Sequence, residues 1–444
     1  MKTLWLAAAG LILAASGWSQ SVGEAPLSAQ VDSVYPQVET LYMDLHRHPE
    51  LSLHEVNTAA KLVARLRELG YDVTEKVGGT GVVGILRNGA GPTVMLRTEL
   101  DALPVEEKTG LAYASTVRTK DDAGHDVPVM HACGHDIHMA AWVGTATIMA
   151  HSKSEWHGTL VLIAQPAEER GLGAKNMIAD GLFTRFPKPD VGVALHTTNS
   201  LPAGEVGFTP EYAASNADTV NITIYGKGGH GASPESTVDP IVIAARVVLT
   251  LQTIVSRETK PGDPAVITVG YIQGGTKSNI IPDEVHLGLT VRSYTPDVRK
   301  HLLAAIERVA KAEAQAADAP KAPLVQVVES TDSLYNDPKL AERLSRALTQ
   351  ALGAGRVQKE PPIMASEDYS YFVEAGVPSF YFWLGVADPE KFKEAKASGV
   401  HLPSNHSPFF APDMEPSLKT AIESEVAVLR SLMAPSNNAG AGLH

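Results

Sequence analysis

The chain has 444 residues, enough for two or three domains at about 100–200 residues per domain. Hydrophobic residues make up 44% and charged residues 20%, which is the balance of a globular protein and excludes a disordered chain. Asp and Glu outnumber Lys and Arg by 50 to 37, giving a formal charge of −13. This acidity, without a dense basic stripe, argues against nucleic-acid binding.

Residues 1–23 have the features of a secretory signal peptide. Lys2 supplies a positive charge, and small residues follow an apolar stretch over residues 4–15 that is too short to span a bilayer. A buried N-terminal helix is the alternative. No other segment reaches about 18 apolar residues, so no membrane anchor is expected. The sequence therefore predicts an exported protein, periplasmic or secreted.

Helical and strand-like patterns alternate through the first half of the chain. Apolar residues at helical spacing occur over residues 38–45, 56–66 and 137–150. Strand-like apolar runs cover residues 81–86, 93–96, 160–164 and 191–195. Apolar strands separated by helices predict an α/β fold with a mostly parallel sheet covered by helices on both faces.

The pattern changes near residue 211. Strand-like residues 221–225, 266–272 and 285–291 and helical residues 240–254 and 298–316 give a β-α-β-β-α order, typical of a small α+β sandwich. An Ala- and Pro-rich stretch, residues 317–323, resembles a linker. Two further helices, 338–352 and 418–432, and an aromatic strand, 379–384, follow. We therefore predict a catalytic α/β domain (31–210 and 323–433), an inserted lid or dimerisation domain (211–322) and a disordered tail (434–444).

Polar residues follow several of the predicted strands directly. Asp101 comes shortly after residues 93–96, Glu168 and Glu169 after 160–164, and His196 after 191–195. The run His131-Ala-Cys-Gly-His-Asp136 precedes the helix at 137–150. Because ligands bind at the carboxyl ends of the strands in open α/β sheets, these groups are expected to converge on one edge.

Thiolate, imidazole and carboxylate are the ligands of zinc and similar ions. A turn at Gly134 can direct both Cys133 and His135 at one site. The adjacent Glu168 and Glu169 must point differently, so one can bind metal while the other acts as a general base. The general base would take a proton from a water molecule shared by two metals about 3.5–4 Å apart. Binding to metal lowers the pKa of such a water towards about 7.

Other interpretations remain open at this stage. Cys133 and His135 could form a thiol nucleophile and its base, although residues this close on a tight turn rarely reach that geometry. The glycine-rich residues 226–231 could be a simple turn. The fold could also belong to a binding protein that has lost catalysis. Several histidines have a structural or surface role as their simplest interpretation: His46, His48, His54, His131 and His151.

Taken together, these motifs resemble dinuclear-metal amidohydrolases of the hippurate hydrolase and indoleacetyl-amino-acid hydrolase type, within the aminoacylase and carboxypeptidase G family of metallopeptidases. The resemblance runs from about residue 34 to residue 432. Its most specific segment is Met130-His-Ala-Cys-Gly-His-Asp-Ile-His138. Further segments are Leu96-Arg-Thr-Glu-Leu-Asp-Ala-Leu-Pro104, Gln165-Pro-Ala-Glu-Glu169, Gly228-Gly-His-Gly231, Ser278-Asn-Ile-Ile-Pro282, Ser366-Glu-Asp368 and Asn405-His-Ser-Pro408.

The resemblance implies a role for each matching residue. It implies two divalent metal ions per subunit, zinc being expected and manganese, cobalt or nickel being alternatives. Glu168 would be the general base, and His230 would stabilise the oxyanion from a partner subunit, which implies a homodimer. The implied metal ligands are Cys133, bridging the ions, with His135, Glu169, His196 and His406. Asn279 and Arg292 would hold the substrate carboxylate, and Asp101 and His138 would orient ligands.

The resemblance implies hydrolysis of the amide bond of N-acyl amino acids or related small acyl amides. A dipeptidase or carboxypeptidase on the same scaffold is the alternative. Two departures from the family pattern border the expected acyl pocket. Thr197-Thr-Asn follows His196 where relatives often have an aromatic residue, and residues 116–127 are longer and more polar. No particular substrate is therefore carried over.

Overall fold

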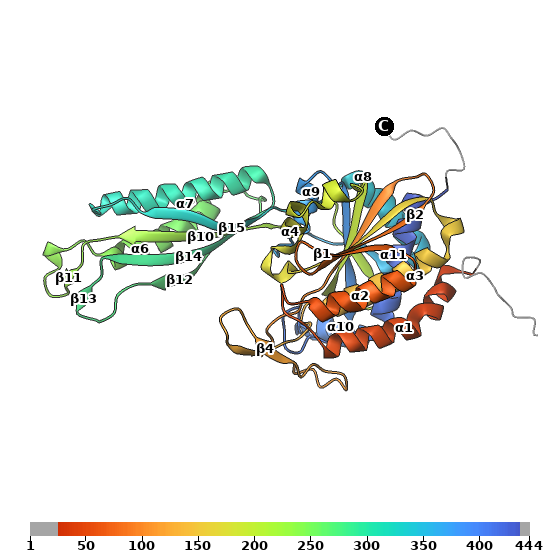
Figure 1. The fold of residues 1–444 in the computed structure, drawn as a ribbon. Helices are drawn as coiled ribbons and strands as arrows, with labels where there is room; N and C mark the ends of the chain where they lie inside the picture. The colour runs from red at the N-terminus through yellow and green to blue at the C-terminus, as the bar shows by residue number, and fades with distance from the viewer. Residues whose placement is uncertain (1–24, 436–444) are drawn as a thin grey trace, which may run out of the picture.

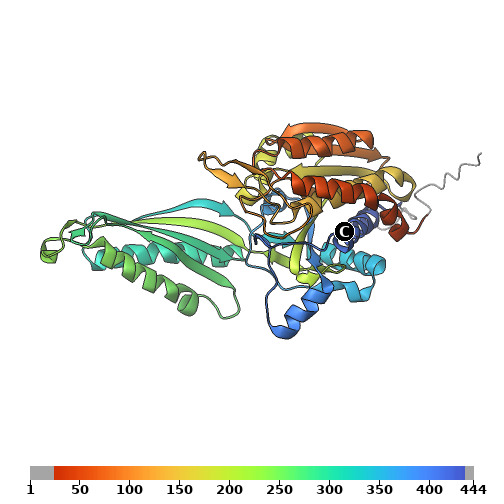
Figure 2. The ribbon, with the colours of Figure 1, turned by 90° about the horizontal axis from the view of Figure 1, so that it is seen from below.

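The computed structural model describes residues 25–435. The predicted signal peptide and residues 436–444 of the predicted tail lie outside the described residues. The described chain forms a larger α/β domain and a smaller, elongated domain that projects from one side of it (Figures 1 and 2).

The larger domain is built on an eight-stranded sheet. In spatial order its strands are β1 (Asp72–Val77), β2 (Gly81–Asn88), β6 (Gly158–Gln165), β3 (Thr93–Glu99), β7 (Val191–Pro202), β18 (Ser379–Ala387), β8 (Val206–Phe208) and β17 (Val357–Lys359). The four central strands β6, β3, β7 and β18 are parallel, whereas β1, β2 and β8 pair antiparallel towards the edges. The predicted mostly parallel α/β fold is confirmed.

Helices cover both faces of this sheet, because successive side chains of each strand point to opposite faces. Val94 and Leu96 of β3 belong to one hydrophobic core, while Met95 between them belongs to the other. The first core includes α1 (Leu27–Arg47), α2 (Val56–Glu68), α3 (His135–His151), α8 (Pro338–Leu352) and α11 (Met414–Met433). The second includes α4 (Gly173–Ala179), α5 (Leu182–Arg185) and α9 (Ser370–Glu374).

Short elements connect these layers. They are the hairpin β4 (Arg118–Lys120) and β5 (Asp126–Pro128), the pair β9 (Glu211–Ala214) and β16 (Leu334–Asn336), helix α10 (Pro389–Ser398), and the short turns η2 (Lys153–Glu155), η3 (Glu168–Arg170) and η6 (Ala354–Arg356). The turn η3 follows β6 directly and carries both adjacent glutamates. The β4–β5 hairpin lies largely within residues 116–127, the segment that is longer and more polar than in the family pattern.

The smaller domain is an antiparallel four-stranded sheet, with two helices supplying the rest of its core. Its elements are β10 (Asn216–Tyr225), β11 (Gly229–His230), η4 (Pro234–Ser236), α6 (Pro240–Thr253), η5 (Ile254–Glu258), β12 (Ala265–Gln273), β13 (Ile280–Ile281), β14 (Glu284–Ser293), α7 (Pro296–Ala316) and β15 (Leu324–Thr331). The strand order is β12-β14-β10-β15, and β11 pairs with β13 beyond it.

The structure corrects the predicted return to the larger domain at residue 323. Strand β15 pairs with β10 of the smaller sheet, so the chain leaves the smaller domain only after Thr331. Most side chains of β15 are exposed, because the strand lies at an edge. It therefore lacks the apolar alternation by which strands are recognised in a sequence.

The stretch Pro240–Glu258, formed by α6 and η5, is long and apolar enough to cross a membrane by length and composition alone. This corrects the expectation that no segment after the leader reaches that length. Ile243, Val247 and Leu251 of α6 are buried in the core of the smaller domain. We therefore interpret the stretch as a core helix with one exposed side.

Candidate metal centre and active site

Five side chains converge at one edge of the large sheet, from the N-terminus of α3, the turn η3, strand β7 and the loop before α11. The Cys133 sulfur lies 3.4 Å from Nε2 of His196 and 3.3 Å from Nε2 of His406. His406 Nε2 is also 3.4 Å from the Glu169 carboxylate, which lies 4.0 Å from Nε2 of His135. The structure thus brings the five predicted ligands together.

Their chemistry fits a pair of divalent metal ions. Nε2 of His135 and Oε1 of Glu169 are buried without a hydrogen-bond partner among residues 25–435, which is costly unless a ligand binds them. Cys133 belongs to two overlapping ligand groups, one with His135 and His196 and one with Glu169 and His406. A sulfur shared by two groups suits a bridging position between two ions.

The electrostatic environment of Cys133 also favours a bound metal ion. Burial and the carboxylates of Glu169 and Glu168 raise the pKa of its thiol well above the ordinary value. A thiol in this environment ionises only when a cation is bound beside it. Burial also raises the pKa of Glu169, to about 7. These surroundings disfavour the alternative in which Cys133 is a free nucleophilic thiolate.

Backbone carbonyls orient two of the histidines. Nδ1 of His135 lies 2.8 Å from the carbonyl oxygen of Asp101, and Nδ1 of His196 lies 2.8 Å from that of Thr197. With Nδ1–H donating to these carbonyls, Nε2 of each ring is left as the electron-pair donor towards the centre. His406 adopts a left-handed backbone conformation, φ 70°, and its N–H donates to the carbonyl of Ala132 at 2.7 Å.

Asp101 supports the turn that carries the two glutamates. Its buried carboxylate accepts the backbone N–H groups of Glu168 and Glu169 at 3.1 and 3.0 Å, and the hydroxyl of Ser52 at 2.6 Å. The turn contains a second constraint, since Ala167 has φ 48° and its N–H donates to Glu55. Asp101 thus fixes the backbone of two neighbouring residues for which different roles are predicted.

His138 lies behind the ligands. Its Nδ1 is 2.8 Å from Glu99, and its Nε2 accepts the backbone N–H of Thr197 at 2.9 Å. Its ring centroid is 4.8 Å from that of His196. The position agrees with the predicted orienting role, which stays a prediction for both His138 and Asp101.

A buried charge cluster beneath the centre was not predicted from the sequence. The guanidinium of Arg97 contacts Glu99 and donates to Glu367 at 2.7 Å and Asp368 at 3.2 Å. A charged residue inside the apolar strand 93–99 was the available signal. The carboxylates of Glu367 and Asp368 lie close to Glu168. Burial and then Glu367 raise the pKa of Glu168 well above its ordinary value.

The centre opens into a pocket of about 470 Å³. Glu168 and Glu169 line it together with Cys133, His196 and His406. Its outer wall comes from residues of the segment 360–366, between β17 and α9, and Trp383 of β18 lines it as well. The predicted general base Glu168 is therefore exposed to the same cavity as the predicted metal ligands.

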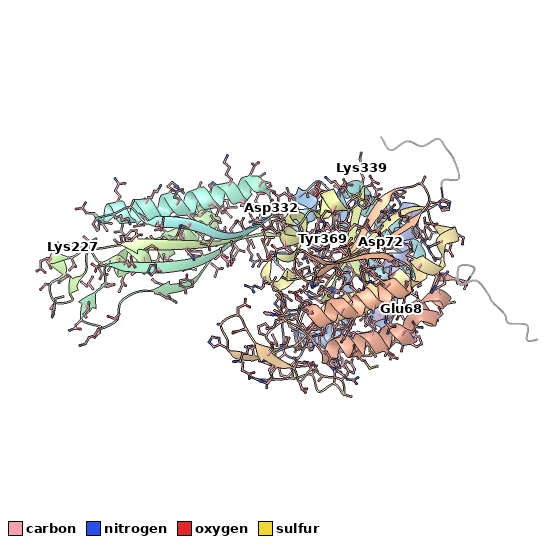
Figure 3. All side chains as sticks on the ribbon, viewed as in Figure 1. Glu68, Asp72, Lys227, Asp332, Lys339 and Tyr369 are labelled. Atoms are coloured by element: carbon pink, nitrogen blue, oxygen red, sulfur yellow. The ribbon has the colours of Figure 1, made fainter. Side chains whose placement is uncertain are left out.

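The predicted substrate-binding residues of the smaller domain do not meet within one chain. His230 and Asn279 are neighbours at the far tip, where the N–H of Gly231 donates to the Asn279 carbonyl at 2.9 Å. Lys227, three residues earlier, marks this tip in Figure 3. Arg292 lies at the opposite end of β14, roughly 27 Å from its first residue at about 3.4 Å per residue. There it donates to the carbonyl of Met364 at 3.0 Å.

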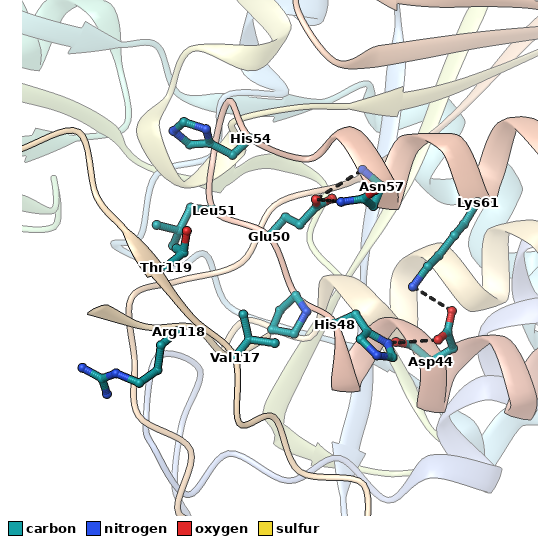
Figure 4. Close-up of a pocket in the computed structure, with 11 residues that line it drawn as sticks. Asp44, His48, Glu50, Leu51, His54, Asn57, Lys61, Val117, Arg118 and Thr119 are labelled. Atoms are coloured by element: carbon teal, nitrogen blue, oxygen red, sulfur yellow. Dashed lines mark hydrogen bonds and ion pairs between the residues drawn. The ribbon is translucent and has the colours of Figure 1, made fainter. Parts of the chain in front are cut away.

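A second hollow, of about 610 Å³, lies between the end of α1 and the β4–β5 hairpin. Figure 4 shows that several of its polar and charged side chains pair with one another. Lys61 and His48 contact Asp44 at 2.7 and 3.0 Å, and the side chain of Asn57 donates to Glu50 at 2.7 Å. This hollow therefore offers no convergent set of free catalytic groups.

Comparisons with known proteins support the interpretation of this site as a metal-dependent active site. The model of a family described as Peptidase family M20/M25/M40 matches residues 95–401, and the chain belongs to this family. Hippurate hydrolase of Campylobacter jejuni is 35% identical over 76% of this chain and 85% of that protein. Thermostable carboxypeptidase 1 of Saccharolobus solfataricus is 34% identical over 83% of this chain and 88% of that protein.

A solved structure extends the comparison to the whole fold. A dinuclear metal binding peptidase from the M20 family of Bacillus subtilis has a TM-score of 0.74 and 27% identity, covering 90% of this chain and 98% of that chain. The family resemblance drawn from the motifs is confirmed, and the protein is a metal-dependent amidohydrolase of this peptidase family. The roles of individual residues stay predictions.

Proposed function

We propose that the protein hydrolyses N-acyl amino acids, releasing the acyl group as a carboxylic acid and the amino acid with a free amine. The observation that carries this proposal is the position of Glu168, which lines one pocket together with Cys133, His196 and His406. The name of the hippurate hydrolase relative, 35% identical, supports an acylated amino acid as the substrate class.

Two divalent ions held by Cys133, His135, Glu169, His196 and His406, zinc being our first choice, would acidify the attacking water and polarise the scissile carbonyl. Glu168 accepts the proton of that water as it attacks. The same carboxyl then donates the proton to the departing nitrogen. The raised pKa of Glu168, caused by burial and by Glu367, suits this second task because it favours the protonated carboxyl.

We further propose that a homodimer completes each active site. His230 and Asn279 lie at the distal tip of the smaller domain, away from their own chain's centre, which supports their supply by a partner subunit. Helix α6 offers a surface for such an interface, since Leu249 and Val242 are 72% and 56% exposed. His230 would then stabilise the oxyanion, while Arg292 and the partner's Asn279 hold the substrate carboxylate.

We propose an exported location for the enzyme, on the strength of the leader features in residues 1–23. A single cysteine in an exported protein is exposed to oxidation unless it is protected. Cys133 is buried among the predicted metal ligands, which provides that protection.

A carboxypeptidase is the second candidate, because the thermostable carboxypeptidase relative is 34% identical over 83% of the chain. Both candidates release a free amino acid, so they differ only in the acyl side of the cleaved bond. An N-acyl amino acid has one amide bond, whereas a peptide presents a chain that must extend out of the pocket.

A substrate panel tests both. Benzoyl-glycine, other N-acyl amino acids, free dipeptides and N-blocked peptides are offered to the enzyme as isolated, after chelation, and after restoring single metals. We expect release of free amino acid from the acylated members, lost on chelation and regained with a divalent ion. Preferential cleavage of blocked peptides would favour the carboxypeptidase, and activity that survives chelation would contradict the metal mechanism.

A further inference from the structure

The outer wall of the pocket carries a carboxylate that the proposed chemistry does not use. Glu360 lies just after β17 and lines the same cavity as Glu168 and His196. Its backbone is fixed from both sides, since its N–H donates to the Phe208 carbonyl at 2.9 Å and its carbonyl accepts the hydroxyl of Thr209 at 3.0 Å. The side chain therefore leaves the backbone in a defined direction.

A glycine makes room for this side chain. A Cβ atom added at Gly207 of β8 would lie 2.5 Å from Cγ of Glu360, so Glu360 occupies the space that a side chain at 207 would fill. Gly207 pairs with Trp383, and Trp383 pairs in turn with His196. The carboxylate arm of Glu360 thus lies two strand spacings, roughly 10 Å, along the sheet from a predicted metal ligand.

The side chains of this row share one face of the sheet. The ring centroids of His196 and Trp383 are 6.2 Å apart, so the indole forms the floor between the centre and Glu360. This span suits a ring-sized acyl group whose carbonyl is at the centre and whose far end reaches Glu360.

Among residues 25–435, Glu360 has no cationic partner of its own. Within residues 25–435 no ion pair and no side-chain hydrogen bond reaches its carboxylate, although the residue is half-buried. Burial and the nearby Glu205 raise its pKa. An acidic group in this position gains a favourable partner when a ligand brings a positive charge.

The positive charge of Arg292 lies near the other end of the wall segment that begins at Glu360. Residues 360–364 run from Glu360 to Met364, whose carbonyl accepts a hydrogen bond from Arg292. If Arg292 holds the carboxylate of the amino acid, the acyl group extends the other way, towards Glu360. In this arrangement the acyl group would face a negative charge and the carboxylate of the amino acid a positive one.

We infer that Glu360 is a specificity-determining residue that selects acyl groups carrying an amine at their far end. This inference rests on the proposed hydrolysis of N-acyl amino acids and specifies its substrate class. It predicts that a cationic tip is preferred over a neutral tip of the same size, and that the preference depends on the charge of Glu360.

Two substrates of equal shape test it, namely 4-(aminomethyl)benzoyl-glycine and 4-ethylbenzoyl-glycine. We expect the metal-loaded enzyme to favour the first by about tenfold in kcat/KM, the effect of one partly buried charge pair. In Glu360→Gln this ratio should fall to about one. Glu394→Gln, an exposed position on α10 that removes the same charge, should keep the wild-type ratio.

Binding of the two free acids, 4-(aminomethyl)benzoate and 4-ethylbenzoate, gives a second readout that needs no turnover. A calorimetric preference for the first acid that is lost in Glu360→Gln upholds the inference even if no member of the panel is hydrolysed, an outcome that would overturn only the proposed reaction. Hydrolysis of benzoyl-glycine with no cationic preference, or with a preference unchanged in Glu360→Gln, overturns the role of Glu360 and leaves the reaction standing.

Discussion

The carboxylate of Asp101 lies 3.0 Å from the backbone nitrogen of Glu169 and accepts its N–H. Asp101 thus holds a predicted metal ligand through the ligand's main chain, and it holds Glu168 in the same way at 3.1 Å. One buried group just after β3 therefore sets the relative positions of the predicted metal ligand Glu169 and the predicted general base Glu168.

Asp101→Asn keeps the shape of the side chain but replaces one acceptor oxygen with an NH2 group that faces a backbone N–H. We expect metal affinity to fall by about 10- to 100-fold, as for other residues that orient metal ligands. Competition with a chelator of known affinity measures the change. Ser52→Ala, which removes only one hydrogen bond to Asp101, should have a smaller effect. Unchanged affinity in Asp101→Asn would contradict the supporting role.

Glu168→Gln separates proton transfer from metal binding. Glutamine cannot accept a proton at neutral pH, so kcat should fall by about 100- to 10,000-fold, the usual contribution of a general base. Metal content, measured by elemental analysis, should stay at the wild-type value because Glu168 is not among the predicted ligands. Glu169→Gln is the matched comparison, since it should lose metal together with activity. Near-normal turnover in Glu168→Gln would refute its assignment.

The larger domain and its centre could be predicted because their signals are local. An apolar run marks each central strand, and two predicted ligands lie close to such runs, His196 within β7 and Glu169 shortly after β6. The Arg97 cluster could not be predicted, since Arg97 and its partner Glu367 are 270 residues apart. Only the folded sheet brings the strand β3 and the segment before α9 together.

The smaller domain shows the limit of motif matching for a different reason. His230 and Asn279 are neighbours in space, but Arg292, which is predicted to act together with Asn279, is separated from both by the length of β14. A linear motif does not record which end of a strand faces the active site. The edge strand β15 was assigned to the wrong domain, because its exposed side chains follow no burial pattern.

Hybrid dimers test whether His230 acts on its own chain or on its partner. Glu168→Gln and His230→Ala are expressed together with different tags, and the mixed dimer is isolated. In the mixed dimer, one site combines an intact Glu168 with an intact His230 from the other chain. We expect this dimer to regain about half the wild-type activity, whereas each single variant is nearly inactive. A mixed dimer as inactive as its parents would place His230 in its own chain's site.

Leu249 on α6 tests the interface on which that arrangement depends. A lysine at this position puts a charge into an apolar contact and should shift the protein from dimer to monomer. Light scattering coupled to size-exclusion chromatography measures the mass, and activity should fall with dimer content. Val56→Lys, an apolar residue of similar exposure on α2, 63% against 72%, is the control. A dimeric Leu249→Lys variant would mean that α6 does not form the interface.

Glu425 gives the stability of the larger domain a defined pH dependence. Burial raises the pKa of its carboxyl to about 8, although the Thr145 hydroxyl donates to it at 2.6 Å. The unfolded chain ionises this group near the ordinary value of 4.5, so the native state binds the extra proton between pH 4.5 and 8. The contribution to stability is therefore full below pH 4.5 and is lost progressively as the pH rises to 8.

Glu425→Gln removes this titration while keeping the size of the side chain. We expect its Tm to match the wild type near pH 5 and to exceed it increasingly up to pH 8, by several degrees, since one pKa unit corresponds to about 1.4 kcal/mol. Calorimetry of the metal-saturated proteins at both pH values measures the difference. Thr145→Val, which removes the hydrogen bond but keeps the carboxyl, should extend the wild-type decline to higher pH, because the ionised form loses its donor and the folded-state pKa rises further. Parallel pH profiles for wild type and Glu425→Gln would show that Glu425 titrates alike in the folded and unfolded chain.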